Sequence, residues 1–453
     1  MLFASVLSAV SYVQPDTAWL FRYPGTKHRF HEPLTSFVDD TGNVYVAGWS
    51  KEGESRLDAL LLKVDSLGHL VWTRTCDHVT AAGAARDKNG NLYIAGVTND
   101  ATVAGKICML KYRPDGDTDW VRTYSEPGKS FSALGTIAID DSQNVYACGV
   151  AESSSCFAVR VVKYTPDGVL SDVKRYTLCG YTYLLDGEFH VLGNGEAYLA
   201  LSAENPDVDG DWVVVKLSAD SRVLWDRVDK DTGSGWERLI WSQVDEDASI
   251  YLTGEVVSAV YGTEVFCTMK MDSSGKIRWT SEYLGPDSLR SRPRFLLLAN
   301  GNVYVSGWNM CIKNGQDVAI AVLKYDSLGN RLWARQYGDK YTVSIPGNAD
   351  ENDEPTPGLN YCSMKVDDSG NVYLAGTGDD YPLTCHSLSF FAVLLKYDPR
   401  GNLVWARRLP ESQQETWFGE TIALDNRGAL YSIGVENIEG SSLGIYVLKY
   451  RTR

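Results

Sequence analysis

Closely spaced acidic side chains are the residues of this sequence that suit a chemical role most directly. Asp207, Asp209 and Asp211 stand at alternate positions, and Gly210 lies between the last two. Alternate carboxylates with a glycine bend are typical of the start of a calcium loop, although the downstream glutamate of such loops is missing. A weak Ca²⁺ site and an ordinary polar loop are both compatible with this spacing.

A second acidic cluster lies in a long segment, 338–358, between two repeated blocks. Asp350, Glu351, Asp353 and Glu354 stand there between a glycine and a proline. Carboxylate oxygens are the ligands that hard cations prefer, and the same charges suit a basic partner. A solvated loop without a ligand is the third interpretation. Ca²⁺ is therefore the one candidate cofactor of the sequence.

Two further strings resemble catalytic motifs only superficially. His28, His31 and Glu32 form HRFHE, but the spacing is not that of a zinc protease, and Pro33 prevents a helix from presenting both histidines. GSSLG around Ser442 matches G-x-S-x-G, yet it stands between two expected strands, whereas a nucleophile elbow requires a strand-to-helix turn. We therefore predict no catalytic residues and a protein that is not an enzyme.

Four tryptophans are candidates for a ligand-binding face. Trp49 and Trp308 directly follow a repeated glycine, and Trp212 and Trp236 stand in variable connections. Exposed aromatic rings stack on sugars or hold peptides. Each ring could equally close the top of the core, and the sequence leaves both interpretations open.

Composition limits the class of protein. The chain of 453 residues is 44% hydrophobic and 22% charged, as in globular proteins, and its formal net charge is −15. Such a charge repels nucleic acid and favours a basic partner or a cation. Since no apolar run is long enough for a membrane-spanning helix, we expect no membrane span.

Residues 1–16 are expected to be a leader. The first nine resemble the end of a secretory signal segment without its basic start. A truncated signal peptide and an ordinary apolar leader both remain open. Export would fit a secreted or envelope protein.

The nine cysteines do not form a recognisable metal or redox motif. Cys108 and Cys267 occupy the same position of two repeats, within apolar runs, and are expected to be small buried hydrophobes. In an oxidising compartment, loops could be bridged by two pairs of cysteines: Cys148 with Cys156, or Cys362 with Cys385.

One block recurs eight times along the chain. Its central tyrosine stands at 45, 93, 146, 198, 251, 304, 373 and 431, so most steps are 48 to 53 residues. A period near 50 is typical of four-stranded propeller blades. In the first block we expect strands near 34–38, 43–49, 58–64 and 70–75, joined alternately by tight glycine turns. Residues 17–453 are therefore predicted to form one eight-bladed, all-β propeller with antiparallel four-stranded blades.

The two ends of the chain are expected to share the last blade. The eighth block, 418–450, lacks a fourth strand, while segment 17–23 carries Trp19 where a fourth strand holds its tryptophan. Pairing of 17–23 with 443–450 would complete the blade and cover a sheet edge.

Other repeated residues are interpreted as scaffold. A tryptophan recurs at positions 72, 120, 225, 279, 333 and 405. Each side chain can bury about 150–250 Å², worth roughly 4–6 kcal/mol, and is expected to pack as a wedge between neighbouring blades. The repeated lysine is expected to cover apolar surface with its stem. Asp172 replaces the tryptophan in the third block, which predicts a looser outer edge, and Leu201 replaces a repeated glycine in the fourth.

The segments D-x-x-G-N-hydrophobic-Tyr and Lys-x-D-x-x-G resemble the SBBP family of bacterial β-propeller repeats. The D-x-x-G-x-x-x-W segment is also similar, more weakly, to eight-bladed quinoprotein-like propellers, although their adjacent cysteine pair is missing. The first resemblance implies a secreted or cell-envelope protein and carries no catalytic motif.

Function is expected on the variable loops that follow the second and fourth strands of each blade. We predict a monomeric, non-catalytic scaffold that recognises a protein or glycan there. A structural surface or adhesin module and a glycan hydrolase or lyase are the alternatives.

Overall fold

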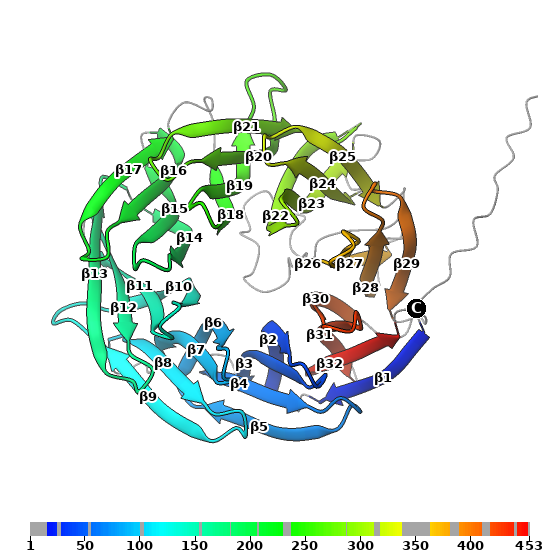
Figure 1. Ribbon diagram of the computed structural model, residues 1–453, viewed down its shortest axis with the longest axis horizontal. Coiled ribbons are helices and arrows are strands. Elements are labelled where there is room, and N and C mark those ends of the chain that lie inside the picture. Colours follow the sequence, from blue (N-terminus) through cyan, green and yellow to red (C-terminus); the bar gives the residue numbers. More distant parts are fainter. Residues whose placement is uncertain are drawn as a thin grey trace, which may run out of the picture.

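The computed structural model describes residues 16–24, 29–52, 56–99, 104–153, 156–181, 183–205, 208–229, 237–286, 288–311, 318–337, 363–380, 389–409, 417–438 and 442–451. They form eight antiparallel four-stranded sheets, which stand as blades around a central channel (Figure 1). The predicted eight-bladed β-propeller is therefore confirmed. Within the described ranges, no helix is long and apolar enough to cross a membrane.

Each blade is a meander that runs from the channel outward. The innermost strands are β2 (Arg29–Val38), β6 (Val79–Arg86), β10 (Phe131–Ile139), β14 (Tyr183–Val191), β18 (Arg238–Val244), β22 (Ser288–Ala299), β26 (Ser363–Val366) and β30 (Trp417–Leu424). The second strands are β3 (Val44–Glu52), β7 (Leu92–Thr98), β11 (Val145–Ser153), β15 (Ala197–Asn205), β19 (Ile250–Val257), β23 (Asn302–Cys311), β27 (Val372–Asp380) and β31 (Leu430–Ile438). The third strands are β4 (Arg56–Val64), β8 (Ile107–Tyr112), β12 (Cys156–Tyr164), β16 (Val208–Leu217), β20 (Glu264–Met271), β24 (Val318–Asp326), β28 (Ser389–Tyr397) and β32 (Ser442–Arg451). The outer strands are β5 (Leu70–Cys76), β9 (Thr118–Tyr124), β13 (Leu170–Cys179), β17 (Val223–Asp229), β21 (Ile277–Tyr283), β25 (Arg331–Tyr337), β29 (Leu403–Leu409) and β1 (Asp16–Tyr23).

The ring closes through the two ends of the chain. β1 pairs antiparallel with β32, so that Tyr23 lies opposite Ile445 and Asp16 lies opposite Arg451. In Figure 1 the blue β1 therefore forms the outer edge of the red C-terminal blade. The predicted closure is confirmed, and it covers the strand edge that β32 would otherwise expose.

The hydrophobic core lies between blades rather than inside any one of them. One cluster, for example, joins Tyr93 and Met109 of blade 2 to Val145 and Val162 of blade 3, all of them buried. A single sheet has no apolar partner of its own, so each blade depends on its neighbours for burial.

The repeated tryptophan joins the outer part of each seam. Trp120 of blade 2 is 6% exposed and donates its indole N–H to the Pro166 carbonyl of blade 3 at 3.1 Å. Its ring lies on Gly168 of the same β12–β13 turn, where φ is +81° and an added Cβ would stand 2.9 Å from the ring. Five more pairs repeat the ring-on-glycine contact: Trp19 on Gly68, Trp72 on Gly116, Trp225 on Gly275, Trp279 on Gly329 and Trp333 on Gly401. The predicted wedge between blades is confirmed.

The seam between blades 3 and 4 replaces this wedge with polar contacts. Asp172 stands in the tryptophan position, and Lys174, 2% exposed, donates to the carbonyls of Ser218 at 3.0 Å and Ala219 at 2.8 Å. Ser221, in place of the turn glycine, donates its hydroxyl to Asp172 at 3.2 Å. Without an indole ring above it, this turn has room for a side chain. The hydrogen bonds of Lys174 and Ser221 therefore take the place of the missing tryptophan at the outer edge of blade 3, which the sequence predicted to be looser.

The repeated lysine and tyrosine form a second scaffold contact. In each of the eight blades the lysine Nζ lies 4.6 to 5.7 Å from the centroid of the tyrosine ring on the neighbouring strand. In blade 2, the Tyr93 hydroxyl donates to the Asp87 carboxylate at 3.1 Å. The backbone N–H of Asn91 donates to the same carboxylate at 2.8 Å. These repeated residues therefore serve the scaffold rather than a ligand.

Blade 4 compensates for its missing glycine. In blade 1, Gly48 lies opposite Pro33, and an added Cβ would stand 2.0 Å from the Glu32 carbonyl oxygen. In blade 4 the same position holds Leu201, and its partner across the strands is Gly187. In blade 4 the glycine of this strand pair therefore stands on the inner strand instead of the second.

The cysteines only partly follow the expectation. Cys108 and Cys267 are buried, 1% and 0% exposed, as expected. The pairing of Cys148 with Cys156 is wrong, because Cys156 forms a disulfide with Cys179, its direct neighbour across β12 and β13. Cys148 lies buried on β11 as a free thiol.

We expect Gly168→Ala to destabilise the protein by about 2–4 kcal/mol, because the new methyl group strains the backbone and displaces the Trp120 ring. Gly128 is the matched control, since its φ is +70° but nothing lies within 4 Å of an added Cβ. Gly128→Ala should therefore cost only about 1 kcal/mol. Urea unfolding measures both values, and equal losses would contradict the wedge.

Glu32 on β2 is a buried acid that the scaffold does not neutralise. It is 7% exposed, and its Oε1 has no hydrogen-bond partner among the described residues. Burial raises the pKa of its carboxyl to about 8. The folded protein therefore keeps this proton from about pH 4.5 to 8, where the unfolded chain releases it, and stability falls as the pH rises through this window.

Glu32→Gln should remove this pH dependence, because an amide does not titrate. We expect the variant to be more stable than the parent by about 3 kcal/mol at pH 7, with the difference shrinking toward pH 4.5. Denaturant unfolding at several pH values tests this. A difference that does not change with pH would show that ionisation of Glu32 is not its cause.

Candidate functional site

The acidic residues singled out in the sequence do not assemble into a site within the described structure. Asp207 and the 338–358 segment with Asp350, Glu351, Asp353 and Glu354 lie outside the described residues, as do Cys362 and Cys385, and nothing is described of the Asp209 side chain. Asp211 is 6% exposed and accepts a hydrogen bond from the Tyr181 hydroxyl at 2.9 Å. Across the described ranges, no group of three or more His, Cys, Asp or Glu side chains is placed to hold a metal ion.

Two of the four candidate tryptophans belong to the core. Trp212 is 2% exposed and Trp308 is 6% exposed, so neither presents a ring face to solvent. Trp308 is covered by Arg292, whose guanidinium lies 5.5 Å from the ring centroid. Of the two interpretations that the sequence left open, closure of the core holds for these two rings, and a place on an exposed ligand-binding face is wrong for them. Trp49 is half-buried on β3, and Trp236 lies outside the described residues.

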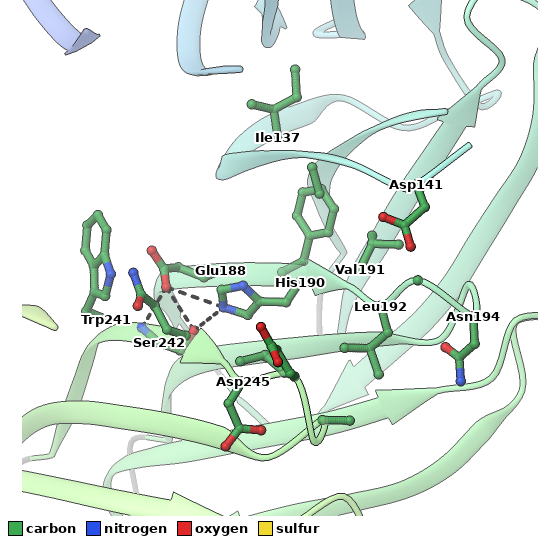
Figure 2. Close-up of a pocket in the computed structure, with 17 residues that line it drawn as sticks. Ile137, Asp141, Glu188, His190, Val191, Leu192, Asn194, Trp241, Ser242 and Asp245 are labelled. Atoms are coloured by element: carbon green, nitrogen blue, oxygen red, sulfur yellow. Dashed lines mark hydrogen bonds and ion pairs between the residues drawn. The ribbon is translucent and has the colours of Figure 1, made fainter. Parts of the chain in front are cut away.

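A cavity of about 880 Å³ opens at the channel, along the inner strands of blades 3, 4 and 5. β10, β14, β18 and the turns that follow them line it, and Figure 2 shows the side chains. These turns lead from the first to the second strand of each blade. The cavity therefore lies at the opposite end of the channel from the variable loops in which the sequence predicts function.

Three side chains make a hydrogen-bonded group in this cavity (Figure 2). The backbone N–H and the hydroxyl of Ser242 on β18 both donate to one Glu188 oxygen, at 2.7 and 2.8 Å. His190 Nε2 lies 2.7 Å from the Ser242 hydroxyl oxygen. Glu188 and His190 are two residues apart on β14, so strand alternation places them on the same face, toward blade 5.

Part of this group serves the scaffold. An innermost strand is a sheet edge, and its free N–H groups need acceptors. Elsewhere in the ring, Gln243 Oε1 accepts the Leu298 N–H at 2.8 Å and Ser363 accepts the Ile422 N–H at 3.3 Å, each from the preceding blade. Glu188 does the same for Ser242. The seam between blades 4 and 5 differs in combining a carboxylate with an imidazole beside a cavity.

The hydrogen bonds indicate the proton positions. A carboxylate only accepts, so the Ser242 hydroxyl proton points to Glu188, and His190 Nε2–H donates to the hydroxyl oxygen. Burial lowers the pKa of His190 to about 4, so the ring is neutral at physiological pH. In this tautomer Nδ1 is a hydrogen-bond acceptor, and no described residue donates to it.

Trp241 and Gln243 form another part of the lining. The Trp241 ring packs against Phe295 of blade 6 with centroids 4.7 Å apart, which holds it at the channel. Gln243 is oriented by its bond to Leu298, and this leaves its NH₂ group as a donor. An aromatic ring beside oriented polar groups is typical of sites for sugars and peptides.

Carboxylates from two turns complete the lining: Asp141, Asp245 and Glu246. Asp245 is occupied, because it accepts the N–H groups of Asp247 and Ser249 at 3.0 and 2.8 Å and lies 3.5 Å from Lys270 Nζ. Chemically, the cavity offers many acceptors, few donors and the aromatic rings of Phe189, His190 and Trp241.

The sequence identified little of this site. His190 stands on the inner strand of the fourth blade and lines the cavity. The sequence missed Glu188, Trp241 and Ser242, because no motif links residues on different blades. One usable signal was the departure of the fourth block from the repeat, since LGNG replaces the D-x-x-G turn next to this cavity. Ser442 is the first residue of β32, whereas the sequence places it in the loop before that strand, and neither position is that of a nucleophile elbow.

Comparisons with solved structures find chains that are remote in sequence. The Dos1 propeller is 10% identical with a TM-score of 0.47, and the match covers 97% of this chain and 93% of that one. The WD40 domain of SCAP from fission yeast is 11% identical with a TM-score of 0.45, covering 95% and 98%. The polysaccharide lyase Uly1 is 10% identical with a TM-score of 0.46, covering 97% and 100%. No protein-family model matches the chain, and no curated protein is similar to it in sequence.

His190→Gln should flatten the acid limb of the stability curve. The folded state resists protonation of His190 from pH 6.5 down to about 4, whereas the unfolded chain takes up the proton, so stability falls as the pH falls through this window. The loss is at most about 3 kcal/mol. Urea unfolding between pH 4 and 7 should show a shallower slope for the variant, and identical slopes would contradict a neutral His190.

Proposed function

We propose that this propeller is a non-catalytic binding scaffold that takes a segment of a protein or glycan partner into the channel cavity. The observation that carries the proposal is the cavity itself, where Trp241 stands beside polar side chains contributed by three blades. A purely structural surface or adhesin module does not need such a cavity. Recognition is therefore favoured over the structural alternative.

The state of the polar groups supports binding over catalysis. Ser242 is 1% exposed, so its hydroxyl offers little surface to a substrate, although His190 lies within hydrogen-bond distance. Glu188 and Asp245 already accept backbone N–H groups. A glycan hydrolase needs two acids free to act on one bond, and these two hold the scaffold.

Export to the cell envelope or the secreted fraction is part of the proposal. The disulfide between Cys156 and Cys179 supports it, because stable disulfides belong to oxidising compartments. The resemblance of the repeats to the SBBP family points to the same location. We propose a monomer, since the ring closes on itself and leaves no blade incomplete.

Trp241→Ala should abolish most binding in a screen of glycan and peptide arrays, because the indole ring is the largest aromatic side chain that lines the cavity. We expect a loss of affinity of at least tenfold, the size expected for a buried aromatic anchor. Binding is measured by calorimetry on the best array ligand.

Trp49→Ala is the matched control, because Trp49 is a half-buried tryptophan on β3 that does not line the cavity. It should leave the affinity unchanged. The reverse result, with loss only in Trp49→Ala, would move the binding site to the loop face that the sequence predicts.

A further inference from the structure

Lys365 on β26 is a lysine that the scaffold does not employ. The repeated lysine of the same blade, Lys396, has its Nζ 4.9 Å from the centroid of the Tyr373 ring. Lys365 stands opposite this tyrosine on the innermost strand and is partly exposed. It makes no hydrogen bond or ion pair with any described residue. Its amine therefore has no structural task within the described part of the ring.

Strand alternation turns Lys365 toward blade 8. Two residues before it, the Ser363 hydroxyl accepts the N–H of Ile422 on β30 at 3.3 Å. The residue between them, Met364, faces the other way and packs into the apolar cluster that blade 7 shares with blade 6. Residues two apart on a strand share a face, so Lys365 also faces β30, which stands next to β26 at the channel in Figure 1.

The seam between blades 5 and 6 shows what an innermost strand needs at this level. Gln243 stands opposite the repeated tyrosine, and its Oε1 accepts the Leu298 N–H of the next blade at 2.8 Å. Lys365 and Leu424 occupy these two positions at the seam between blades 7 and 8. At that seam a lysine amine therefore takes the place of an amide oxygen beside an edge N–H.

The N–H of Leu424 favours the uncharged form of this amine. The following residue, Asp425, donates its own N–H to the Ala429 carbonyl at 3.1 Å, so the Leu424 N–H points away from β31 and toward the seam. An ammonium group has donors only, whereas the lone pair of a neutral amine can accept this N–H. The arrangement of the backbone therefore disfavours protonation of Lys365.

The surroundings of Lys365 act in the same direction. Ile422, on the facing strand, is fully buried in the apolar cluster of blades 7 and 8. The acid nearest in sequence, Asp367, already accepts hydrogen bonds from the Asn371 side chain at 2.8 Å and the Tyr373 hydroxyl at 3.2 Å. Burial lowers the pKa of Lys365, and no carboxylate among the described residues offsets this shift.

We infer that Lys365 is a nucleophilic amine that captures an aldehyde from the channel as an imine. A desolvated lysine without a counterion is the type of side chain that forms Schiff bases. The nitrogen attacks the carbonyl carbon, and the carbonyl oxygen leaves as water with the two amine hydrogens, so no oxidant or reductant is needed. An anion suits the site less well, because the chain carries a net charge of −15. This inference goes beyond the proposed function and does not depend on the cavity of blades 3 to 5.

The test is reductive labelling of the full chain at about pH 8 with glyceraldehyde and cyanoborohydride, which reduces an imine to a stable secondary amine. Peptide mass spectrometry measures the labelling rate of each lysine. Lys88, exposed on a turn of blade 2, is the comparison. We expect Lys365 to react roughly tenfold faster, because each unit by which a pKa is lowered gives about tenfold more neutral amine.

A second pair of probes identifies the source of the aldehyde. The ring of cellobiose opens to an aldehyde at its reducing end, whereas the alditol of cellobiose has no carbonyl. Label from cellobiose but not from the alditol would assign a reducing sugar, and label from glyceraldehyde alone would assign a small aldehyde. Either result supports the imine.

Lys365→Gln is the matched variant, because it offers Leu424 the acceptor that Gln243 offers Leu298. It should keep the parental melting temperature, so that its loss of label reports the missing amine rather than unfolding. Lys88 in this variant should be labelled at the parental rate.

Two results would overturn the inference. If Lys365 is labelled no faster than Lys88 at pH 8, its amine is protonated or closed to the channel. If the labelling rates of the two lysines change with pH in the same way, access rather than a deprotonated amine explains any difference between them. Neither result bears on the proposed binding function, which Trp241→Ala tests at a different site.

Discussion

The contact between neighbouring blades is the interaction on which the rest of this structure depends. A four-stranded sheet cannot bury an apolar face alone, and the buried clusters of this protein are shared between adjacent blades. Burial is complete only when every blade has two neighbours, so the ring has to close. The pairing of β1 with β32 is therefore part of the core as much as of the sheet: Trp19 on β1 donates its indole N–H to the Ser66 carbonyl of blade 1 at 2.9 Å.

Where one contact between blades is missing, both residues of the contact differ from the repeat. The absence of a tryptophan at Asp172 is matched by the absence of a glycine at Ser221, and the two side chains hydrogen-bond to each other. Within blade 4, Leu201 stands opposite Gly187 on the neighbouring strand. These paired changes show that contacts between blades and between strands restrict pairs of positions rather than single residues. A contact between two blades can be polar or apolar, provided that the side chains on both blades are complementary.

This restriction on pairs of positions explains which parts of the fold could be predicted from the sequence. The blade count, the strand order and the closure follow from residues that recur with a fixed period, because each copy meets the same neighbours in space. The disulfide was mispredicted because Cys148 and Cys156 are near in sequence, whereas cross-strand register places Cys179 opposite Cys156. Burial of Trp212 and Trp308 was also not visible, since a loop-side aromatic ring can turn inward or outward with the same local sequence.

The candidate cavity was harder to predict for the same reason. Its lining comes from single, non-repeated residues on three blades, such as Glu188, Ser242 and Asp141, whose proximity depends on the ring and not on local spacing. In a repeat protein the shared residues are occupied by the scaffold, and only positions that differ between blades are free to meet a ligand. The fourth blade differs most in its inner strand and turn, and the cavity opens there. Departures from the repeat that the scaffold does not need, like the LGNG turn of the fourth blade, are therefore the places at which a contact with another molecule is to be sought.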